Sequence, residues 1–291
     1  MLQHVYIKNE GQNLLGAYHQ PPPDTPRRPL GIVMLHGWAG YRVGAHQMFK
    51  RLSAWAEEDG FVSLRFDFRG RGDSEGDAED TTLTTMISDT VAAVKWLVEE
   101  SGLQRIALVG DCSGAEVAIG AGPLCPQVDT MILWSAPMVG TDRSEADRAK
   151  KWHIIGEYFR KLFRRETWSK LFSGSLQFDM IKKAILRGGR GAGEDGAEID
   201  ETIDWRKRFV NFGGETYFVY GGNDPVAEPS LDYYASLCRL AGRPFHSHVV
   251  EKANHAFYSV AWEEEVMRVT LDWLRSRCQE AGAGIEAAGP C

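Results

Sequence analysis

The feature that most constrains this chain is the apolar run 106–109 followed by the pentapeptide Gly-Asp-Cys-Ser-Gly at 110–114. The residues after it, above all 117–119, are apolar at helical spacing. The pattern predicts a strand, a sharp turn and a helix. A turn of the form G-x-nucleophile-x-G lifts one side chain above the end of the strand, because the small flanking glycines relieve crowding. Cys112 occupies that raised position.

The alternative register, with Ser113 as the nucleophile, is disfavoured because its flanking residues would be Asp111 and Ala115. Their Cβ atoms crowd a turn that needs glycine. A cysteine at a helix N-terminus also experiences the positive end of the helix dipole, which favours the reactive thiolate. The competing interpretation is a buried structural cysteine, so partners elsewhere in the chain have to decide.

Composition indicates a soluble globular α/β protein without a cofactor or metal. Of its 291 residues, 43% are hydrophobic and 25% are charged, which fits one core with an insertion. The five cysteines are scattered and form no C-x-x-C pair, so we expect neither disulfides nor a zinc site. A net charge of −7 argues against nucleic-acid binding. No signal peptide and no membrane-spanning run is evident, so a cytoplasmic location without stable membrane insertion is expected.

Strands are expected to alternate with amphipathic helices, which predicts a mostly parallel sheet. An N-terminal hairpin is expected over 4–18. Further strands are expected at 31–35, 61–66, 106–111, 131–134, 215–220 and 245–250, and helices at 46–59, 83–100 and 262–277.

The alternation fails in one internal segment, where aromatic residues recur at helical spacing and a glycine-rich stretch follows. We therefore predict an α/β core in two parts, 1–137 and 205–280, with a helical lid over 138–204. The small, polar residues 281–291 are expected to form a disordered tail.

Two later residues complete a catalytic arrangement with Cys112. Asp224 follows an apolar strand in Gly-Gly-Asn-Asp-Pro, and His255 follows the last strand in Ala-Asn-His-Ala-Phe. A thiolate nucleophile needs a base, and the base needs an orienting acid. The order nucleophile, acid, base suits an α/β hydrolase. Two non-catalytic interpretations compete with these roles. Asp224 would only open a turn before Pro225, and His255 would be a solvated loop residue.

The loop His36-Gly37-Trp38-Ala39-Gly40 supplies the remaining requirement of acyl transfer. An oxyanion can be stabilised by two backbone N–H groups, each contributing on the order of 3 kcal/mol. We assign these donors to Ser113 and Trp38, and expect His36 to hold the loop's shape. His246 and His248 share a strand face as a metal pair would, but a third ligand is not evident.

These motifs carry a family resemblance. L-H-G-W-A-G, R-F-D-F-R-G-R-G-D-S-E-G, V-G-D-C-S-G, G-G-N-D-P and A-N-H-A-F resemble the α/β-hydrolase superfamily, in particular its lidded branch of monoacylglycerol lipases and cinnamoyl (feruloyl) esterases. The resemblance implies an eight-stranded, mostly parallel sheet with a helical lid after the sixth strand. It also implies catalytic roles for Cys112, Asp224 and His255, and oxyanion donors at Trp38 and Ser113. Those esterases use serine where this chain has Cys112. In having a cysteine as the nucleophile, the chain is similar to dienelactone hydrolases.

The predicted function is hydrolysis of an ester or thioester through a Cys-His-Asp triad and a covalent acyl-thioester. One alternative is an acyltransferase or acyl-releasing thioesterase acting on a coenzyme A or carrier-protein thioester. The other is a non-catalytic binding protein, in which Asp111 raises the pKa of the neighbouring thiol.

The distribution of charged residues along the chain bears on which substrate or partner protein it binds. Residues 138–192 hold thirteen Lys and Arg against six acids, on an otherwise acidic chain. This basic segment is interpreted either as a solvated helical face or as a surface that attracts an anionic thioester or an acidic acyl-carrier protein. Aromatic lid residues would then cover the acyl chain, namely Trp152, Tyr158, Phe159, Phe163 and Trp168. The oligomeric state is left open.

Overall fold

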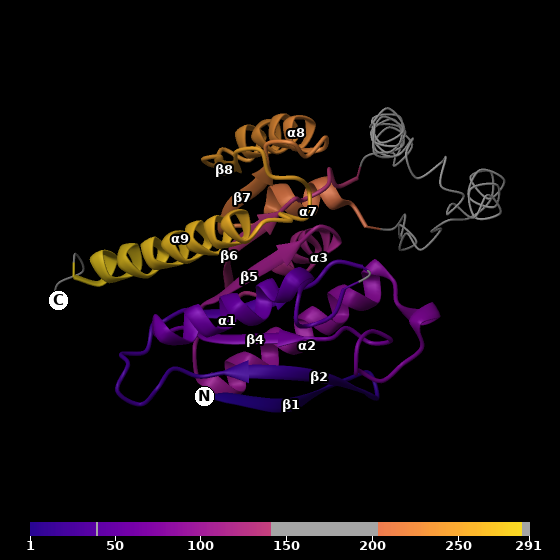
Figure 1. The fold of residues 1–291 in the computed structure, drawn as a ribbon, viewed down its shortest axis with the longest axis vertical. Helices are drawn as coiled ribbons and strands as arrows, with labels where there is room; N and C mark the ends of the chain where they lie inside the picture. The colour runs from indigo at the N-terminus through magenta and orange to yellow at the C-terminus, as the bar shows by residue number, and fades with distance from the viewer. Residues whose placement is uncertain (39, 141–202, 287–291) are drawn as a thin grey trace, which may run out of the picture. The chain divides into compact units, whose positions relative to one another are not determined.

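A computed structural model describes residues 1–38, 40–140 and 203–286 of the protein (Figure 1). The expected lid over 138–204 lies outside the described residues except at its two ends. Its five aromatic residues, predicted to bind substrate, and its basic side chains are therefore not described.

The core is an eight-stranded sheet with the strand order β1-β2-β4-β3-β5-β6-β7-β8 (Figure 1). Strand β2 is antiparallel to both β1 and β4, and the other neighbours are parallel, which confirms the predicted mostly parallel sheet. The strands are β1 Leu2–Asn9, β2 Gln12–His19, β3 Gly31–Leu35, β4 Val62–Phe66, β5 Ile106–Asp111, β6 Val128–Trp134, β7 Glu215–Gly221 and β8 His246–Val250.

Helices cover both faces of the sheet. On one face α1 (Met48–Glu58) and α9 (Val260–Glu286) pack over a buried apolar cluster that includes Phe49, Trp134 and Phe257. The other face carries α2 (Leu83–Ser101), α3 (Ser113–Ala121), α7 (Trp205–Asn211) and α8 (Ala227–Leu240), each packed against the next. Single 3₁₀ turns lie at η1 Ala45–Gln47, η2 Ala78–Asp80 and η3 Gly122–Leu124. In the described part of the chain, no helix is both long and apolar enough to cross a membrane.

The closing helix is longer than the sequence pattern predicted. Helix α9 begins at Val260 and continues to Glu286, past the expected end at Arg277 and into the predicted tail. Each residue added to an existing helix needs no new nucleus, so the helix continues although the added segment holds two glycines and no strong apolar face. Residues 287–291 lie outside the described part.

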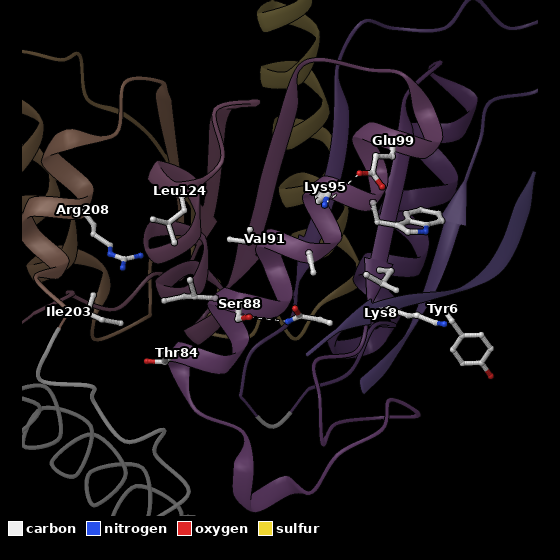
Figure 2. Close-up of a pocket in the computed structure, with 15 residues that line it drawn as sticks. Tyr6, Lys8, Thr84, Ser88, Val91, Lys95, Glu99, Leu124, Ile203 and Arg208 are labelled. Carbon is white, nitrogen blue, oxygen red and sulfur yellow. Dashed lines mark hydrogen bonds and ion pairs between the residues drawn. The ribbon is translucent and has the colours of Figure 1, made fainter. Parts of the chain in front are cut away.

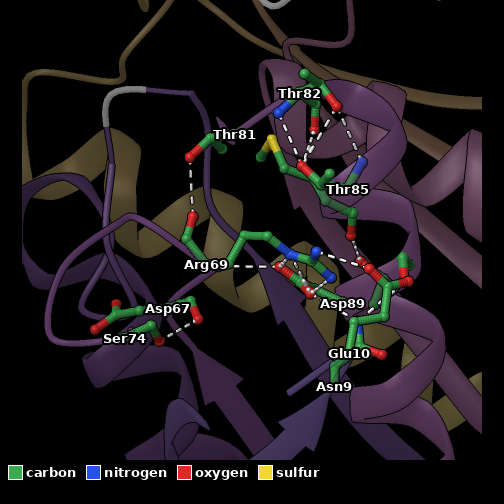
Figure 3. A network of polar contacts seen from close by, with 12 residues as sticks. Asn9, Glu10, Asp67, Arg69, Ser74, Thr81, Thr82, Thr85 and Asp89 are labelled. Atoms are coloured by element: carbon green, nitrogen blue, oxygen red, sulfur yellow. Dashed lines mark hydrogen bonds and ion pairs between the residues drawn. The ribbon is translucent and has the colours of Figure 1, made fainter. Parts of the chain in front are cut away.

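A buried ion pair holds the loop after β4 against the sheet and α2 (Figure 3). Asp89 of α2 is fully buried and accepts hydrogen bonds from the Arg69 backbone N–H at 2.9 Å and from its Nη2 at 2.6 Å. Arg69 Nη1 also contacts Glu10 at 2.8 Å, and Asn9 donates to Asp89 at 2.8 Å. The β1–β2 turn, the loop after β4 and α2 are thereby joined close to the carboxyl ends of the parallel strands.

Candidate active site

Cys112 lies in the turn between β5 and α3, with φ 54° and ψ −118°. Positive φ is strained for a residue with a side chain and often marks a functional position. A Cβ at Gly110 would lie 2.4 Å from the carbonyl oxygen of Gly114, and one at Gly114 would lie 2.0 Å from that of Leu35. Both glycines are therefore required by close backbone contacts, and Cys112 rather than Ser113 holds the raised position.

Asp224 and His255 meet at the carboxyl ends of β7 and β8. The Nδ1 atom of His255 lies 2.7 Å from Oδ2 of Asp224, whose side chain is almost fully buried. The other carboxylate oxygen of Asp224 accepts the backbone N–H of Val226 at 3.1 Å. The carboxylate is thus fixed at both oxygens and can orient the imidazole through Nδ1–H.

His255 also contacts the thiol of Cys112. Burial lowers the pKa of His255, but hydrogen bonds to Asp224 and Cys112, with the charges of both groups, outweigh burial and raise the pKa to about 10. The imidazole is therefore cationic at neutral pH.

Neighbouring loops hold this pair in place. Asn223 donates its backbone N–H to Ala253 at 2.8 Å and its side-chain amide to Lys252 at 2.8 Å, which ties the loop after β7 to the loop after β8. Ser135, at the end of β6, donates its hydroxyl to the carbonyl oxygen of His255 at 2.9 Å. Sequence reasoning missed Ser135, since no local motif singles out a serine at the end of a strand.

A second carboxyl lies next to the nucleophile. Burial raises the pKa of Asp111 to about 6, and the positive charge of His255 partly opposes this rise. Near neutral pH Asp111 is mostly an anion in an unfavourable environment. Its charge adds to that of Asp224 in stabilising the His255 cation.

The two predicted oxyanion donors lie side by side, but one is already engaged. The backbone N–H of Trp38 donates to the hydroxyl oxygen of Ser113 at 2.6 Å. The buried His36 shapes this loop, because its Nδ1 lies 2.8 Å from the Gly37 carbonyl oxygen and its Nε2 accepts the Phe68 N–H at 3.4 Å. Burial lowers the pKa of His36 to about 4, so the ring is neutral.

The other two histidines considered at the sequence level do not form a metal pair. His246 lies 3.5 Å from Glu215, and His248 lies 2.7 Å from Glu265. Among the described residues, no group of three His, Cys, Asp or Glu side chains is placed to hold a metal ion. The structure describes four of the five cysteines, and all four are free thiols: Cys112, Cys125, Cys238 and Cys278.

An open groove of about 870 Å³ lies elsewhere, along the outer surface of α2 (Figure 2). Tyr6 and Lys8 of β1 line one end, and Ile203 and Arg208 line the other. None of the three predicted catalytic residues lines this groove. The groove is therefore separate from the chemistry at Cys112.

A model of the Alpha/beta hydrolase family matches residues 32–269. The chain belongs to this family. Its fold is similar to that of an esterase from Pyrococcus furiosus, with a TM-score of 0.66 and 20% identity over 95% of this chain and 91% of that one. It is also similar to Est1E of Butyrivibrio proteoclasticus, with ferulic acid bound, at a TM-score of 0.63 and 16% identity over 93% and 99%.

Curated relatives match part of the chain. Human Protein ABHD12B is 35% identical over 149 residues, which are 44% of this chain and 40% of that protein. Lysophosphatidylserine lipase ABHD12 of Danio rerio is 36% identical over 89 residues, or 30% and 22%. The chain thus spans less than half the length of these relatives. Family membership, with esterase and lipase relatives, is consistent with an esterase-type hydrolase.

Proposed function

We propose that the protein is an esterase-type acyl hydrolase that forms an acyl-thioester on Cys112. The observation that carries this proposal is the arrangement of Cys112 at a strained turn, with His255 contacting both its thiol and Asp224. The resemblance to lidded monoacylglycerol lipases and feruloyl esterases supports the same reaction class.

In the proposed first step the Cys112 thiolate attacks the ester carbonyl carbon. The resulting oxyanion accepts the N–H of Ser113 and, once the Ser113 hydroxyl has moved away, the N–H of Trp38. His255 donates its proton to the leaving alkoxide, and the C–O bond breaks to release an alcohol. Asp224 keeps the ring oriented through Nδ1.

In the second step His255, now neutral, takes a proton from water as the water oxygen attacks the acyl-thioester. A second oxyanion forms in the same place and collapses to a carboxylic acid, with Cys112 released as the thiolate and His255 again cationic. The cycle consumes one ester and one water and returns the enzyme unchanged.

We keep two alternatives to ester hydrolysis. With an amine or alcohol in place of water in the second step the protein would be an acyltransferase, and with a coenzyme A or carrier-protein thioester as substrate and water as acceptor it would be a thioesterase. The desolvated Asp111 beside Cys112 supports the second alternative, a binding protein that keeps the fold with a sluggish thiol. Product ratios with and without an added amine separate hydrolysis from acyl transfer.

The test is a Cys112→Ala variant, with Cys278→Ala as a matched control because both thiols are half-buried. We expect the first to abolish hydrolysis of p-nitrophenyl esters and the second to leave it unchanged. Intact-protein mass spectrometry of the wild type should show an acyl adduct that hydroxylamine removes. Full activity in Cys112→Ala would refute the proposal. A lysophospholipid belongs in the substrate panel, since the Danio rerio relative is a lysophosphatidylserine lipase.

A further inference from the structure

Three arginines lie in the loops after β3 and β4, near the active-site edge, and two of them have acidic partners in the described part of the chain. Arg42 contacts the buried Asp67 and lies 2.7 Å from Asp73. Arg69, in the same loop as Asp67, is paired with Asp89 and Glu10 (Figure 3). Asp67, Asp73 and Asp89 are therefore already paired with Arg42 or Arg69.

Arg71 is the third arginine. It stacks on Trp38, in the loop after β3 that we call the oxyanion loop, and it has no acidic partner among the described residues. Its guanidinium carbon lies 4.6 Å from the ring centroid of Trp38. A cation over an aromatic ring is attracted to it but keeps its full positive charge. The charge of Arg71 also contributes to the lowered pKa of His36, which shows that it acts on this loop.

Two donor atoms of this stack have no hydrogen-bond acceptor among the described residues. Nε of Arg71 and Nε1 of Trp38 are both buried, and neither has a hydrogen-bond partner among the described residues. Buried donors in folded proteins are nearly always satisfied. An acceptor from outside the described chain would complete the site.

The position of this stack relates it directly to the reaction. Trp38 presents its ring to Arg71 and its backbone N–H to Ser113, the neighbour of Cys112. The loop that holds Arg71 is fixed, because Asp67 accepts the backbone N–H groups of Arg42 at 2.5 Å and of Asp73 at 2.9 Å. A substrate bound at Cys112 would therefore lie near a preorganised guanidinium that has no acidic partner among the described residues.

We propose that Arg71 binds an anionic group of the substrate, a carboxylate or a phosphate, at the rim of the oxyanion loop. The planar guanidinium fork matches both groups and binds them with paired, charge-assisted hydrogen bonds. This inference rests on the proposed esterase function and assigns it a substrate class, esters that carry a negative charge on the acyl or the alcohol part.

The experiment compares matched substrates in the wild type and in Arg71→Met, whose thioether can still pack on the Trp38 ring. On the acyl side the pair is mono-p-nitrophenyl glutarate and neutral p-nitrophenyl valerate. On the alcohol side it is 1-acylglycerol 3-phosphate and neutral 1-acylglycerol. Arg239→Met is the control, because it removes the same charge from an exposed position in α8.

Arg71→Met should lower kcat/KM for the anionic member of one pair by about ten- to a hundredfold, as expected for a lost charge-assisted hydrogen bond. The neutral member and Arg239→Met should be nearly unaffected. The pair that responds identifies which part of the substrate carries the charge. An equal loss on charged and neutral members would show that Arg71 only supports Trp38, and an unchanged kcat/KM on both pairs would equally overturn the proposal.

A second readout separates this inference from the proposed function. If Cys112→Ala hydrolyses the esters as fast as the wild type, the proposed function fails, but Arg71 can still be tested by alkylation of Cys112. The ratio of the rate with anionic iodoacetate to that with neutral iodoacetamide should fall several-fold in Arg71→Met. Mass spectrometry locates the label, and an unchanged ratio contradicts an anion site at Arg71.

Discussion

The backbone N–H of Trp38 donates a 2.6 Å hydrogen bond to the hydroxyl of Ser113, the residue that follows Cys112. One of the two predicted oxyanion donors is therefore satisfied within the protein before any substrate binds. In the proposed mechanism the Ser113 hydroxyl has to move away, and a hydrogen bond from Trp38 to the oxyanion has to replace the broken one.

Ser113→Ala should increase the rate of acylation. A neutral hydrogen bond is worth about 1 kcal/mol net, so removing the competing hydroxyl should raise kcat/KM for a neutral ester by about fivefold. Ser113→Thr keeps the hydroxyl and serves as the control. Steady-state kinetics on p-nitrophenyl butyrate would check this. A slower Ser113→Ala would mean that the hydroxyl itself donates to the oxyanion.

The raised pKa of His255 predicts that the protein loses stability as pH rises. The folded-state pKa is about 10 against an ordinary value of 6.5, so the folded state holds the proton more tightly than the unfolded state. The stabilisation is complete below pH 6.5 and is lost as pH rises through 10. Urea unfolding of the wild type and His255→Gln should show a difference in unfolding free energy that shrinks between pH 7 and pH 10. A pH-independent difference would contradict the charged pair.

Asp111→Asn should stabilise the protein at neutral pH. Because the pKa of this carboxyl is raised from 3.8 to about 6, the stability that Asp111 contributes falls as pH rises across that interval. Removing the charge should therefore increase the unfolding free energy by up to about 3 kcal/mol at pH 7, and by almost nothing below pH 3.8. Asp232→Asn, at an exposed position of α8, is the control. Urea unfolding at the two pH values distinguishes this outcome from a gain that is equal at both.

The sequence predicted those parts of the site that depend on local pattern and chain order. The glycines around Cys112 stand within a few residues of it, and Asp224 and His255 each follow an apolar strand in the expected order. Because parallel strands end at one edge of a sheet, these segments were expected to meet.

Contacts between distant polar side chains were not predictable in this way. The Trp38 N–H and the Ser113 hydroxyl are 75 residues apart in sequence, and no periodicity encodes their hydrogen bond. The unpaired state of Arg71 depends on which acids Arg42 and Arg69 use, and that in turn depends on the packed loop. The end of α9 was missed because propagation of an existing helix needs no apolar pattern.

The Arg69–Asp89 pair leads to a final prediction, that the loop beside the active site depends on one buried carboxylate. Asp89 is fully buried and accepts hydrogen bonds from the Arg69 backbone, the Arg69 guanidinium and Asn9. Asp89→Ala leaves the buried guanidinium without this partner, and breaking a buried pair in this way costs about 3 to 5 kcal/mol.

Glu10→Gln is the matched control for that variant. Glu10 contacts the same guanidinium but is 59% exposed at its side chain, and exposed pairs contribute about 1 kcal/mol or less. Urea denaturation followed by circular dichroism should therefore show a large fall in the unfolding midpoint for Asp89→Ala and a small one for Glu10→Gln. Equal effects would mean that Arg69 is held mainly by its exposed partner. In that case the loop that carries Arg71 would be less rigid than its buried hydrogen bonds indicate, and the selectivity expected for anionic esters would weaken accordingly.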